Sequence, residues 1–259
     1  MPDGRKRRAL GQHFLRDPGV ARAIADLLAP TPADLVLEIG PGEGALTPAL
    51  AARAGRFLGL ELDAGLARRL ADRFDVRHAD ARTWDYRQLS APGGRVLVAG
   101  NLPYSMAKPI LMRLCDAHRT IAEMALMLQR EVAERVAAPP GSRTYGGLSV
   151  LVQLHWSVRL ELRVPPGAFR PPPRVESAVV HLRSRGQPAV PVDDEDRFRR
   201  VVLAAFGQRR KAVANALAAG LNLPPSTARE RLRAAGIDGG RRAETLSLEE
   251  FARLAASGL

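Results

Sequence analysis

The sequence has a single cysteine, Cys115, and few aromatic residues, which make up 5% of its 259 positions. One cysteine cannot form an internal disulfide, so the chain is typical of a reducing compartment and we expect it in the cytoplasm. Cys115 lies in an apolar run and is interpreted as a small buried side chain. No run of about 18 apolar residues occurs, and residues 1–8 lack the apolar core of a signal peptide, so we expect neither a membrane span nor a secretory leader.

Lysine is also scarce, whereas arginine is abundant, and 39 basic residues against 27 acidic ones give a formal net charge of +12. The base composition of a genome can explain arginine in place of lysine, but it does not explain an excess of base over acid. A basic chain attracts polyanions, and nucleic acid is the expected partner. An anionic membrane surface is disfavoured because the sequence has no strongly basic amphipathic helix with an aromatic face.

Short apolar runs alternate with amphipathic stretches in the first half of the chain. The runs predict strands at 35–39, 57–62, 76–79, 95–100 and 121–128, and the stretches predict helices at 45–54, 64–74, 105–117 and 130–138. This βαβα rhythm indicates an α/β fold with a doubly wound, parallel, Rossmann-like sheet. Ahead of it, Asp17 and Pro18 are expected to begin a helix that ends near Leu28.

The pattern changes after Pro140. Residues 149–162 and 175–182 resemble strands and suit an antiparallel pair at one edge of the sheet, joined by the proline-rich loop 164–173. Residues 184–191 resemble a linker, and three helices are expected beyond it, at 195–221, at 226–235 with Ser226 as N-cap, and at 247–256 with a capping box of Ser247 and Glu250. We therefore expect a catalytic domain at 1–185 and a small all-helical domain at 190–259 that contacts RNA.

A glycine-rich turn, Gly40-Pro41-Gly42-Glu43-Gly44, follows the first predicted strand of the sheet. Ligands bind at the carboxyl ends of such strands, where glycine lets the backbone approach them closely. The spacing of Gly40, Gly42 and Ala45 also fits a dinucleotide site, with Glu61 about 20 residues on for a ribose. S-adenosylmethionine is favoured over NAD because Glu38 lies inside the strand and Asp80, which could accept a hydrogen bond from an adenine amine, follows the third strand.

The most specific segment is Asn101-Leu102-Pro103-Tyr104, which follows the fourth predicted strand. The amine of adenine is a poor nucleophile because its lone pair is delocalised into the ring. Hydrogen bonds from that amine to Asn101 Oδ1 and the Leu102 carbonyl would aim the lone pair at a methyl donor, which is catalysis by positioning. Pro103 stiffens the loop, and Tyr104 can stack on a flipped-out base. Phe169, in a rigid proline-rich loop, is expected to be exposed and to stack on the opposite face of the base.

Taken together, these segments resemble the ribosomal RNA adenine dimethyltransferase family, and within it the bacterial members that act on the small subunit. The resemblance covers nearly the whole chain. It is carried by six segments, at 11–15, 38–42, 101–104, 145–149, 169–175 and 206–211, the last of which reads Phe-Gly-Gln-Arg-Arg-Lys.

The resemblance implies transfer of two methyl groups to N6 of each of two adjacent adenosines in the 3′-terminal hairpin of small-subunit (16S) RNA, within an immature 30S subunit. It implies that Gln12 and the Gly40–Gly42 turn hold the methionine end of S-adenosylmethionine. Glu61 would hold the ribose, and Asp80 with the Ala81 backbone would hold the adenine. The remaining residues of the implied cofactor site are His13, Leu15, Glu38, Leu62 and Asn101.

The family commonly has asparagine where this chain has His13, and no metal site is expected. Contacts to RNA phosphates are implied for Arg209, Arg210 and Lys211, and the basic arm with Arg5, Arg7 and Arg8 is expected to add to them. We expect a monomer. Three alternatives stay open at this point: a large-subunit adenine methyltransferase that confers macrolide resistance, a non-catalytic ribosome assembly factor with the same fold, and an NAD-linked oxidoreductase.

Overall fold

The computed structural model describes residues 12–258, and the predicted basic arm with Arg5, Arg7 and Arg8 lies outside them. The chain divides by its contacts into two compact units. The sheet unit comprises residues 12–133 and Ser157–Ser184, and the helical unit comprises Glu134–Trp156 and residues 185–258. The boundary between residues 184 and 185 falls at the start of the predicted linker. The helical unit also contains Glu134–Trp156, a segment that the sequence analysis placed in the first domain.

The sheet unit is built on a seven-stranded sheet with the strand order β4-β3-β2-β5-β6-β9-β7. The first five strands in this order run parallel, and β9 pairs antiparallel with β6. The predicted parallel sheet with an antiparallel edge is therefore confirmed. The strands are β2 (Leu35–Ile39), β3 (Arg56–Glu61), β4 (Val76–His78), β5 (Val96–Asn101), β6 (Glu123–Gln129), β7 (Trp156–Val164) and β9 (Ser177–Ser184).

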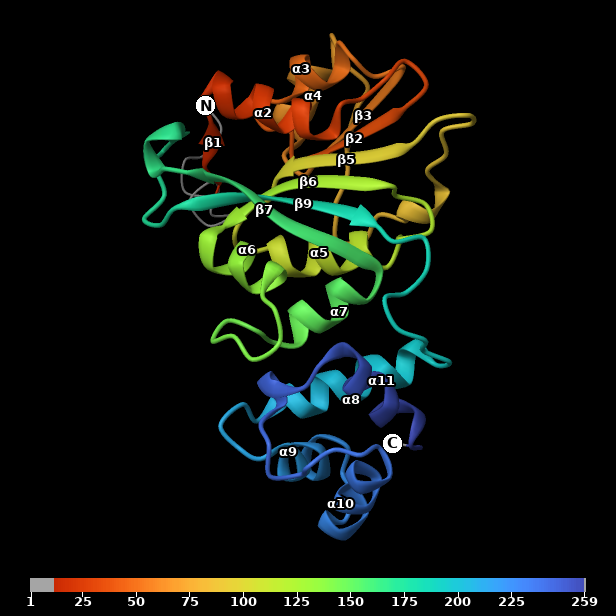
Figure 1. Cartoon of the computed structure of the whole chain (residues 1–259). Helices are drawn as coiled ribbons and strands as arrows, with labels where there is room; N and C mark the ends of the chain where they lie inside the picture. Colours follow the sequence, from red (N-terminus) through yellow and green to blue (C-terminus); the bar gives the residue numbers. More distant parts are fainter. Residues whose placement is uncertain (1–11, 259) are drawn as a thin grey trace. The chain divides into compact units, whose positions relative to one another are not determined.

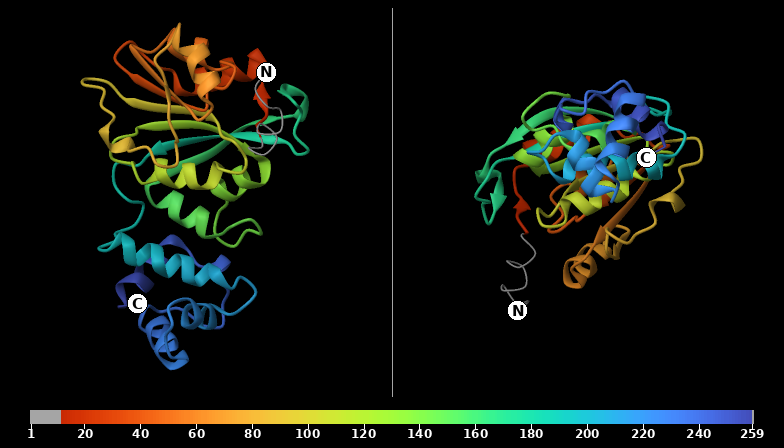
Figure 2. Two further views of the ribbon diagram at one scale, coloured as in Figure 1. Left: turned by 180° about the vertical axis from the view of Figure 1, so that it is seen from behind. Right: turned by 90° about the horizontal axis from the view of Figure 1, so that it is seen from below.

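Helices cover both faces of the sheet, which explains why its central strands are almost wholly apolar. Figures 1 and 2 show α2 (Pro18–Leu28) and α3 (Thr47–Ala51) on one face and α5 (Ala107–Cys115) on the other. The predicted start of α2 is confirmed, since Asp17 accepts hydrogen bonds from the Gly19 and Val20 amides and Pro18 occupies the first helical position. Cys115 is buried as expected. A fourth helix, α4, spans Ala64–Ala71.

A second, two-stranded sheet brings the start of the described chain to the proline-rich loop. β1 (Phe14–Leu15) pairs antiparallel with β8 (Phe169–Arg170), with Leu15 opposite Phe169. A short 3-10 helix, η2 (Pro166–Ala168), precedes β8. Elements this short carry no periodicity, so the sequence did not predict them.

The prediction of a strand at 149–162 was wrong in its first half. Residues Gly147–His155 form a helix, α7, and the strand β7 begins only at Trp156. The run is apolar on several sides, and a short run of this kind fits a buried helix as well as a buried strand. Within the helical unit, the side-chain amide of Gln153 in α7 donates to the carbonyls of Val136 and Ala138, which the sequence pattern could not reveal.

The helical unit contains α8 (Glu195–Gly207), α9 (Val213–Gly220), α10 (Pro225–Ala234), η3 (Ala243–Thr245) and α11 (Leu248–Ala256). The predicted single helix at 195–221 was wrong, because residues 208–212 separate α8 from α9. The predicted N-cap at Ser226 was also wrong, since Pro224 is the cap and α10 begins at Pro225. The capping box of Ser247 and Glu250 is confirmed.

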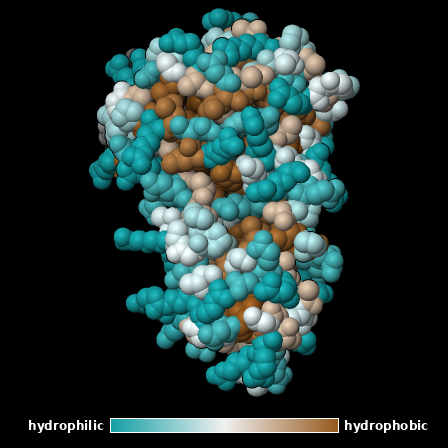
Figure 3. Space-filling view, viewed as in Figure 1, coloured by the Kyte–Doolittle hydropathy of each residue, from teal (hydrophilic) through white to brown (hydrophobic). Residues whose placement is uncertain are grey.

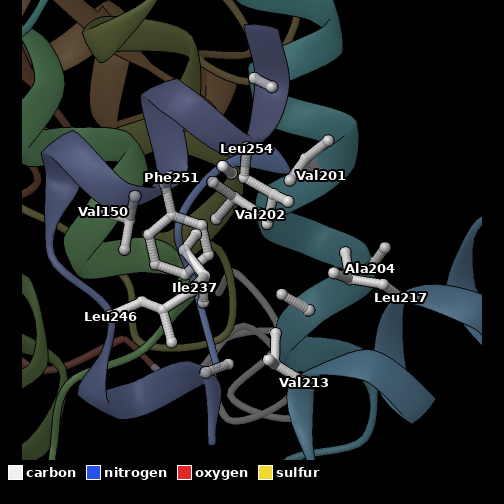
Figure 4. Packing of buried hydrophobic residues seen from close by; sticks show 14 of the residues in the cluster. Val150, Val201, Val202, Ala204, Val213, Leu217, Ile237, Leu246, Phe251 and Leu254 are labelled. Atoms are coloured by element: carbon white, nitrogen blue, oxygen red, sulfur yellow. The ribbon is translucent and has the colours of Figure 1, made fainter. Parts of the chain in front are cut away.

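Each unit has its own apolar core. The core of the helical unit includes Phe198, Leu217 and Phe251, and Figure 4 shows the Phe251 ring near Ile237 and Leu246. Large apolar side chains are exposed at only three described positions, Leu160, Val175 and Leu203, and Figure 3 shows hydrophilic residues over much of the face it presents. Among the described residues, no helix has the length and apolar character needed to cross a membrane.

Candidate active site

A cavity of the sheet unit lies where the parallel strands β2, β3, β4 and β5 end. Twelve of the residues predicted for the site line it: Gln12, His13, Gly40, Gly42, Glu61, Leu62, Asp80, Ala81, Asn101, Leu102, Pro103 and Tyr104. Six further residues line the cavity and were not predicted from the sequence: Phe14, Ile39, Leu60, Ala79, Met106 and Ile110. Ile39, Leu60 and Ala79 could have been found, because they are neighbours of predicted residues at the ends of the same strands.

The turn after β2 requires glycine for two separate reasons. Gly40 and Gly42 have φ angles of 66° and 58°, in the left-handed region that other residues rarely adopt. A side chain on Gly42 would also collide with Phe14, since its Cβ would lie 2.9 Å from the ring. The turn thus packs directly against β1, and together they form one wall of the cavity.

Glu61 ends β3 and ties the glycine turn to the next loop. Its Oε2 accepts the Gly42 amide and its Oε1 accepts the Asp63 amide, each at 2.9 Å. Its side chain is almost fully buried, and this burial raises the pKa of the Glu61 carboxyl above its usual value, although the two amides oppose the shift. The carboxylate is therefore held in one orientation at the cavity wall.

Glu38 is buried behind this wall and is not among the residues that line the cavity. Its Oε2 accepts a hydrogen bond from the Thr47 hydroxyl at 2.7 Å, at the start of α3. Burial raises the pKa of Glu38 to about 8; the Thr47 hydrogen bond opposes the shift and the nearby Glu61 charge adds to it. In the structure, Glu38 joins β2 to α3, so its predicted contact with a cofactor would have to be indirect.

Asp80 follows β4 and already has a partner. The Arg82 guanidinium donates to both carboxylate oxygens, with an Nη2–Oδ2 distance of 2.6 Å, and the Arg82 amide donates to Oδ1. The hydrogen bonds from Arg82 hold the pKa of Asp80 below its usual range. Asp80 is thus ionised and can still accept a bond from a ligand, because an ionised carboxylate offers about four acceptor positions.

Asn101 ends β5 with its side chain oriented by a backbone group. Its Nδ2 donates to the His13 carbonyl at 2.8 Å. The Oδ1 atom has no hydrogen-bond partner within residues 12–258, so it remains available as an acceptor at the cavity. The chain then leaves the sheet in a fixed direction, because the Leu102 amide donates to the Met127 carbonyl.

Tyr104 and His13 form an aromatic pair at the cavity. Their ring centroids lie 5.4 Å apart with planes inclined by 37°. The Tyr104 hydroxyl is 2.6 Å from the hydroxyl of the buried Ser177, and His13 Nδ1 donates to the Pro171 carbonyl at 2.7 Å. Each ring is therefore anchored at its polar end to the segment 171–177, which leaves its apolar surface for contact.

The prediction that Phe169 is exposed was wrong. Its side chain is 4% exposed and belongs to the apolar core of the sheet unit, as does that of Leu15, its partner in the two-stranded sheet. Neither residue lines the cavity. A rigid proline-rich loop limits the backbone, but it does not decide which way a side chain points, so proline content does not predict exposure at this position.

Gln12 has a buried acceptor that the described residues leave without a partner. Its Oε1 is inaccessible to water and accepts no hydrogen bond within residues 12–258. A buried acceptor that is left unsatisfied costs about 1–3 kcal/mol. Because Gln12 lines the cavity, a hydrogen-bond donor on a bound ligand would remove this cost.

Three of the residues predicted to contact RNA lie in the helical unit, in the segment between α8 and α9. Arg209, Arg210 and Lys211 are all exposed. The Arg209 guanidinium donates to the Arg143 carbonyl, whereas Arg210 and Lys211 have no side-chain partner among the described residues. The exposed charges are available to a polyanion.

The family model described as "Ribosomal RNA adenine dimethylase" matches residues 4–257 of this chain. The chain is 46% identical to Ribosomal RNA small subunit methyltransferase A of Geobacter sulfurreducens, over 96% of this chain and 94% of that protein. It is 46% identical to the protein of the same name from Anaeromyxobacter sp. strain K, over 97% of this chain and 93% of the relative.

Two solved structures are similar over most of the chain. One is the crystal structure of the 23S rRNA methyltransferase ErmE, with a TM-score of 0.68 and 26% identity, covering 94% of this chain and 98% of that one. The other is a dimethyladenosine transferase from Plasmodium falciparum, with a TM-score of 0.77 and 23% identity, covering 93% and 96%. The second likeness bears on the fold alone, and it confirms the predicted class.

Proposed function

Because the chain belongs to the ribosomal RNA adenine dimethylase family, we propose that it transfers methyl groups from S-adenosylmethionine to the N6 amine of adenosines in small-subunit ribosomal RNA. The relatives at 46% identity carry the small-subunit name, whereas the 23S methyltransferase structure is 26% identical. This difference favours the small subunit over the large one. The finer target that we propose is two methyl groups on each of two adjacent adenosines in the 3′-terminal hairpin.

The cavity residues fit S-adenosylmethionine. The unsatisfied Gln12 Oε1 suits the ammonium of the methionine end, and the Glu61 carboxylate suits two ribose hydroxyls. Asp80 suits the adenine amine, and Leu62 and Ile110 add apolar surface to the same cavity. When bound, the sulfonium supplies an activated methyl group, so no strong general base is needed.

The observation that carries the proposal is the orientation of Asn101. Its Nδ2 is bonded to the His13 carbonyl, so its Oδ1 is the atom left to accept an N–H of the target amine. Acceptance of that hydrogen bond draws the amine toward a tetrahedral shape and fixes the direction of its lone pair. Asn101 therefore contributes by positioning the amine, and it can do so because the His13 carbonyl already holds its side chain in the required orientation.

The base is held by stacking in this proposal. Tyr104 is anchored through Ser177 and presents its ring at the cavity, and the His13 ring beside it supplies a second planar surface. Because Phe169 is buried, we assign no stacking role to it. After methyl transfer, the N6 nitrogen loses a proton to water.

The helical unit and the basic arm complete the proposal. Arg209, Arg210 and Lys211 would bind RNA phosphates, together with Arg5, Arg7 and Arg8. We propose that the protein acts as a monomer on an immature 30S subunit in the cytoplasm. Light scattering of the purified protein tests the first of these statements, and a dimer at micromolar concentration would contradict it.

The deciding experiment supplies labelled S-adenosylmethionine and small subunits that lack the modification, and then maps the methyl groups on the RNA. We expect label on N6 of two adjacent adenosines near the 3′ end. Label on large-subunit RNA would instead support the resistance enzyme, and tight subunit binding without label would support a non-catalytic assembly factor. Either result would overturn the proposed reaction.

A further inference from the structure

The helical unit contains an open hollow of about 580 Å³ that is separate from the cavity described above. This volume is in the range of sites that bind small ligands or parts of larger ones. The hollow lies between the start of α9, one side of α10 and the loop that follows α10. Its lining residues are Ala212, Ala214, Asn215, Arg229, Arg233, Gly236, Ile237, Asp238, Gly239 and Gly240.

Two arginines of α10 give the hollow its charge. Arg229 and Arg233 are four positions apart, so they lie one turn from each other on the same side of the helix. Both are exposed, and neither side chain has a hydrogen-bond or ion-pair partner within residues 12–258. Like charges at this spacing repel each other by about 0.2–0.5 kcal/mol, and an anion between them would relieve that repulsion.

Other arginines of the same region differ because they have structural partners. Arg231, between the two on α10, donates to the Ser257 carbonyl at 2.6 Å. Arg241 is bound to Glu250, and Arg253 donates to the Ala235 carbonyl. Arg229 and Arg233 are therefore not needed to hold the helices together, and their guanidinium groups face a hollow instead.

The remaining walls add donors and a positive potential. α9 begins at the hollow, and the amino end of a helix carries a partial positive charge. Its first amides are occupied, since Val213 donates to the Arg241 carbonyl and Ala214 to the Gly239 carbonyl, so ligand contacts would come from side chains such as the exposed Asn215 amide. Asp238 is the one acidic lining residue, and its Oδ1 already accepts the Gly240 amide.

We propose that this hollow binds a backbone phosphodiester of the RNA substrate, with Arg229 and Arg233 donating to its oxygens and Asn215 donating beside them. The inference rests on the proposed function for the identity of the RNA. Guanidinium forks suit phosphate because they donate two parallel hydrogen bonds. RNA is favoured over a free small anion because Ala212 of the hollow directly follows Lys211, so the site continues the exposed basic segment at 209–211.

The test compares full-length proteins in binding to unmodified small subunits over a series from 50 to 200 mM KCl. The double variant Arg229→Gln/Arg233→Gln should bind about tenfold more weakly, and the slope of log K against log salt should decrease in magnitude by about 1, as expected when one phosphate contact is lost. The matched control is Arg185→Gln/Arg200→Gln, which removes the same charge from two exposed arginines of the helical unit that lie outside the hollow. It should bind within twofold of the wild type.

Two further measurements make the result decisive. Arg229→Lys/Arg233→Lys should keep the wild-type salt slope but lose part of the affinity, because lysine keeps the charge without the fork. Circular dichroism and S-adenosylmethionine binding should be the same in all variants, which shows that a weaker RNA complex does not come from unfolding.

The inference is overturned if the glutamine double variant binds small subunits with the affinity and salt slope of its control. It is also overturned if, in a parallel titration with inorganic phosphate, the double variant weakens only the binding of that ion. Failure of the proposed function has a different outcome, because the wild-type protein would then place no label on small-subunit RNA. If the wild type methylates small-subunit RNA and the double variant binds small subunits as tightly as the wild type, the RNA site in the hollow is rejected and the proposed function stands.

Discussion

The two units present polar groups to a ligand in opposite ways. In the sheet unit, Asn101 and Glu61 at the cavity are held by hydrogen bonds of the protein, Asn101 by the His13 carbonyl and Glu61 by two backbone amides. In the helical unit, Arg210, Arg229 and Arg233 are exposed and have no partner among the described residues. The first arrangement fixes the positions of individual side-chain atoms, whereas the second accumulates positive charge on the surface. Single substitutions of these ligand-facing polar groups should therefore have large effects in the sheet unit and small, additive ones in the helical unit.

The largest effects should come from the two cores, because each unit has its own. Phe169→Ala in the sheet unit and Phe251→Ala in the helical unit each remove a buried ring, which costs about 3–5 kcal/mol of unfolding free energy. We expect Phe169→Ala to weaken cofactor binding and Phe251→Ala to weaken RNA binding, as measured by calorimetry and filter binding beside denaturant unfolding. The control Val175→Ala, at a position 47% exposed, should change little. If Phe169→Ala kept wild-type stability but lost stacking on the base, the burial of this ring would be refuted.

The next largest effect should come from Asn101→Ala. Loss of an oriented group that acts at the reacting nitrogen typically lowers turnover by about 100-fold or more. Since Asn101 is proposed to position the target amine, we expect kcat to decrease by this factor while the dissociation constant for S-adenosylmethionine stays within about threefold. Single-turnover kinetics and calorimetry measure the two quantities. Equal losses in both would show that Asn101 holds the cofactor rather than the amine.

A smaller effect is expected for Glu61→Gln. The amide would direct an N–H group at the Gly42 or Asp63 amide, and it would lose the charge that attracts ribose hydroxyls. Hydrogen bonds to charged groups contribute about 1.5–3 kcal/mol, so cofactor affinity should fall roughly 10- to 100-fold. Glu43→Gln is the matched control, because Glu43 belongs to the same turn and does not line the cavity. An equal loss in the control would point to general disturbance of the turn.

The smallest effect should come from Arg210→Gln in the helical unit. An exposed cation that contacts one phosphate adds a modest increment of affinity, so RNA binding should weaken only a few-fold and the salt slope should change by about 0.9. The contrast between the units depends on this result as much as on the previous ones. A 100-fold loss of RNA affinity from this single exposed charge would show that the helical unit, like the sheet unit, depends on individual side chains.

The sequence predicted those parts of the fold in which local pattern and tertiary environment agree. The alternating apolar and amphipathic runs predicted all five parallel strands, since strands buried on both faces are continuously apolar. The same logic located the cavity, because residues that follow parallel strands meet at one edge of the sheet. Twelve predicted residues do line it, including Asn101 and Glu61.

The failures have a common physical cause, which is that the deciding contacts are distant in sequence. Phe169 is buried because β8 pairs with β1, more than 150 residues away. The segment 147–155 is helical although its composition fits a strand equally well. The chain breaks between α8 and α9 at 208–212 although Gln, Arg and Lys are good helix formers. Propensity could not predict these features, because at each of them the tertiary contacts favour a different structure from the one that the local sequence pattern favours.

The buried Glu38 makes folding of the sheet unit a proton-binding reaction. In the unfolded chain its carboxyl titrates near the usual 4.5, whereas in the folded protein burial raises the pKa to about 8, so between these values the folded state holds a proton that the unfolded state releases. The free energy of unfolding therefore decreases as pH rises from 4.5 to about 8, and this decrease stops once the carboxyl of the folded protein has ionised. At pH 7, the heat of unfolding measured by calorimetry should depend on the ionisation enthalpy of the buffer, and Glu38→Gln should reduce that dependence.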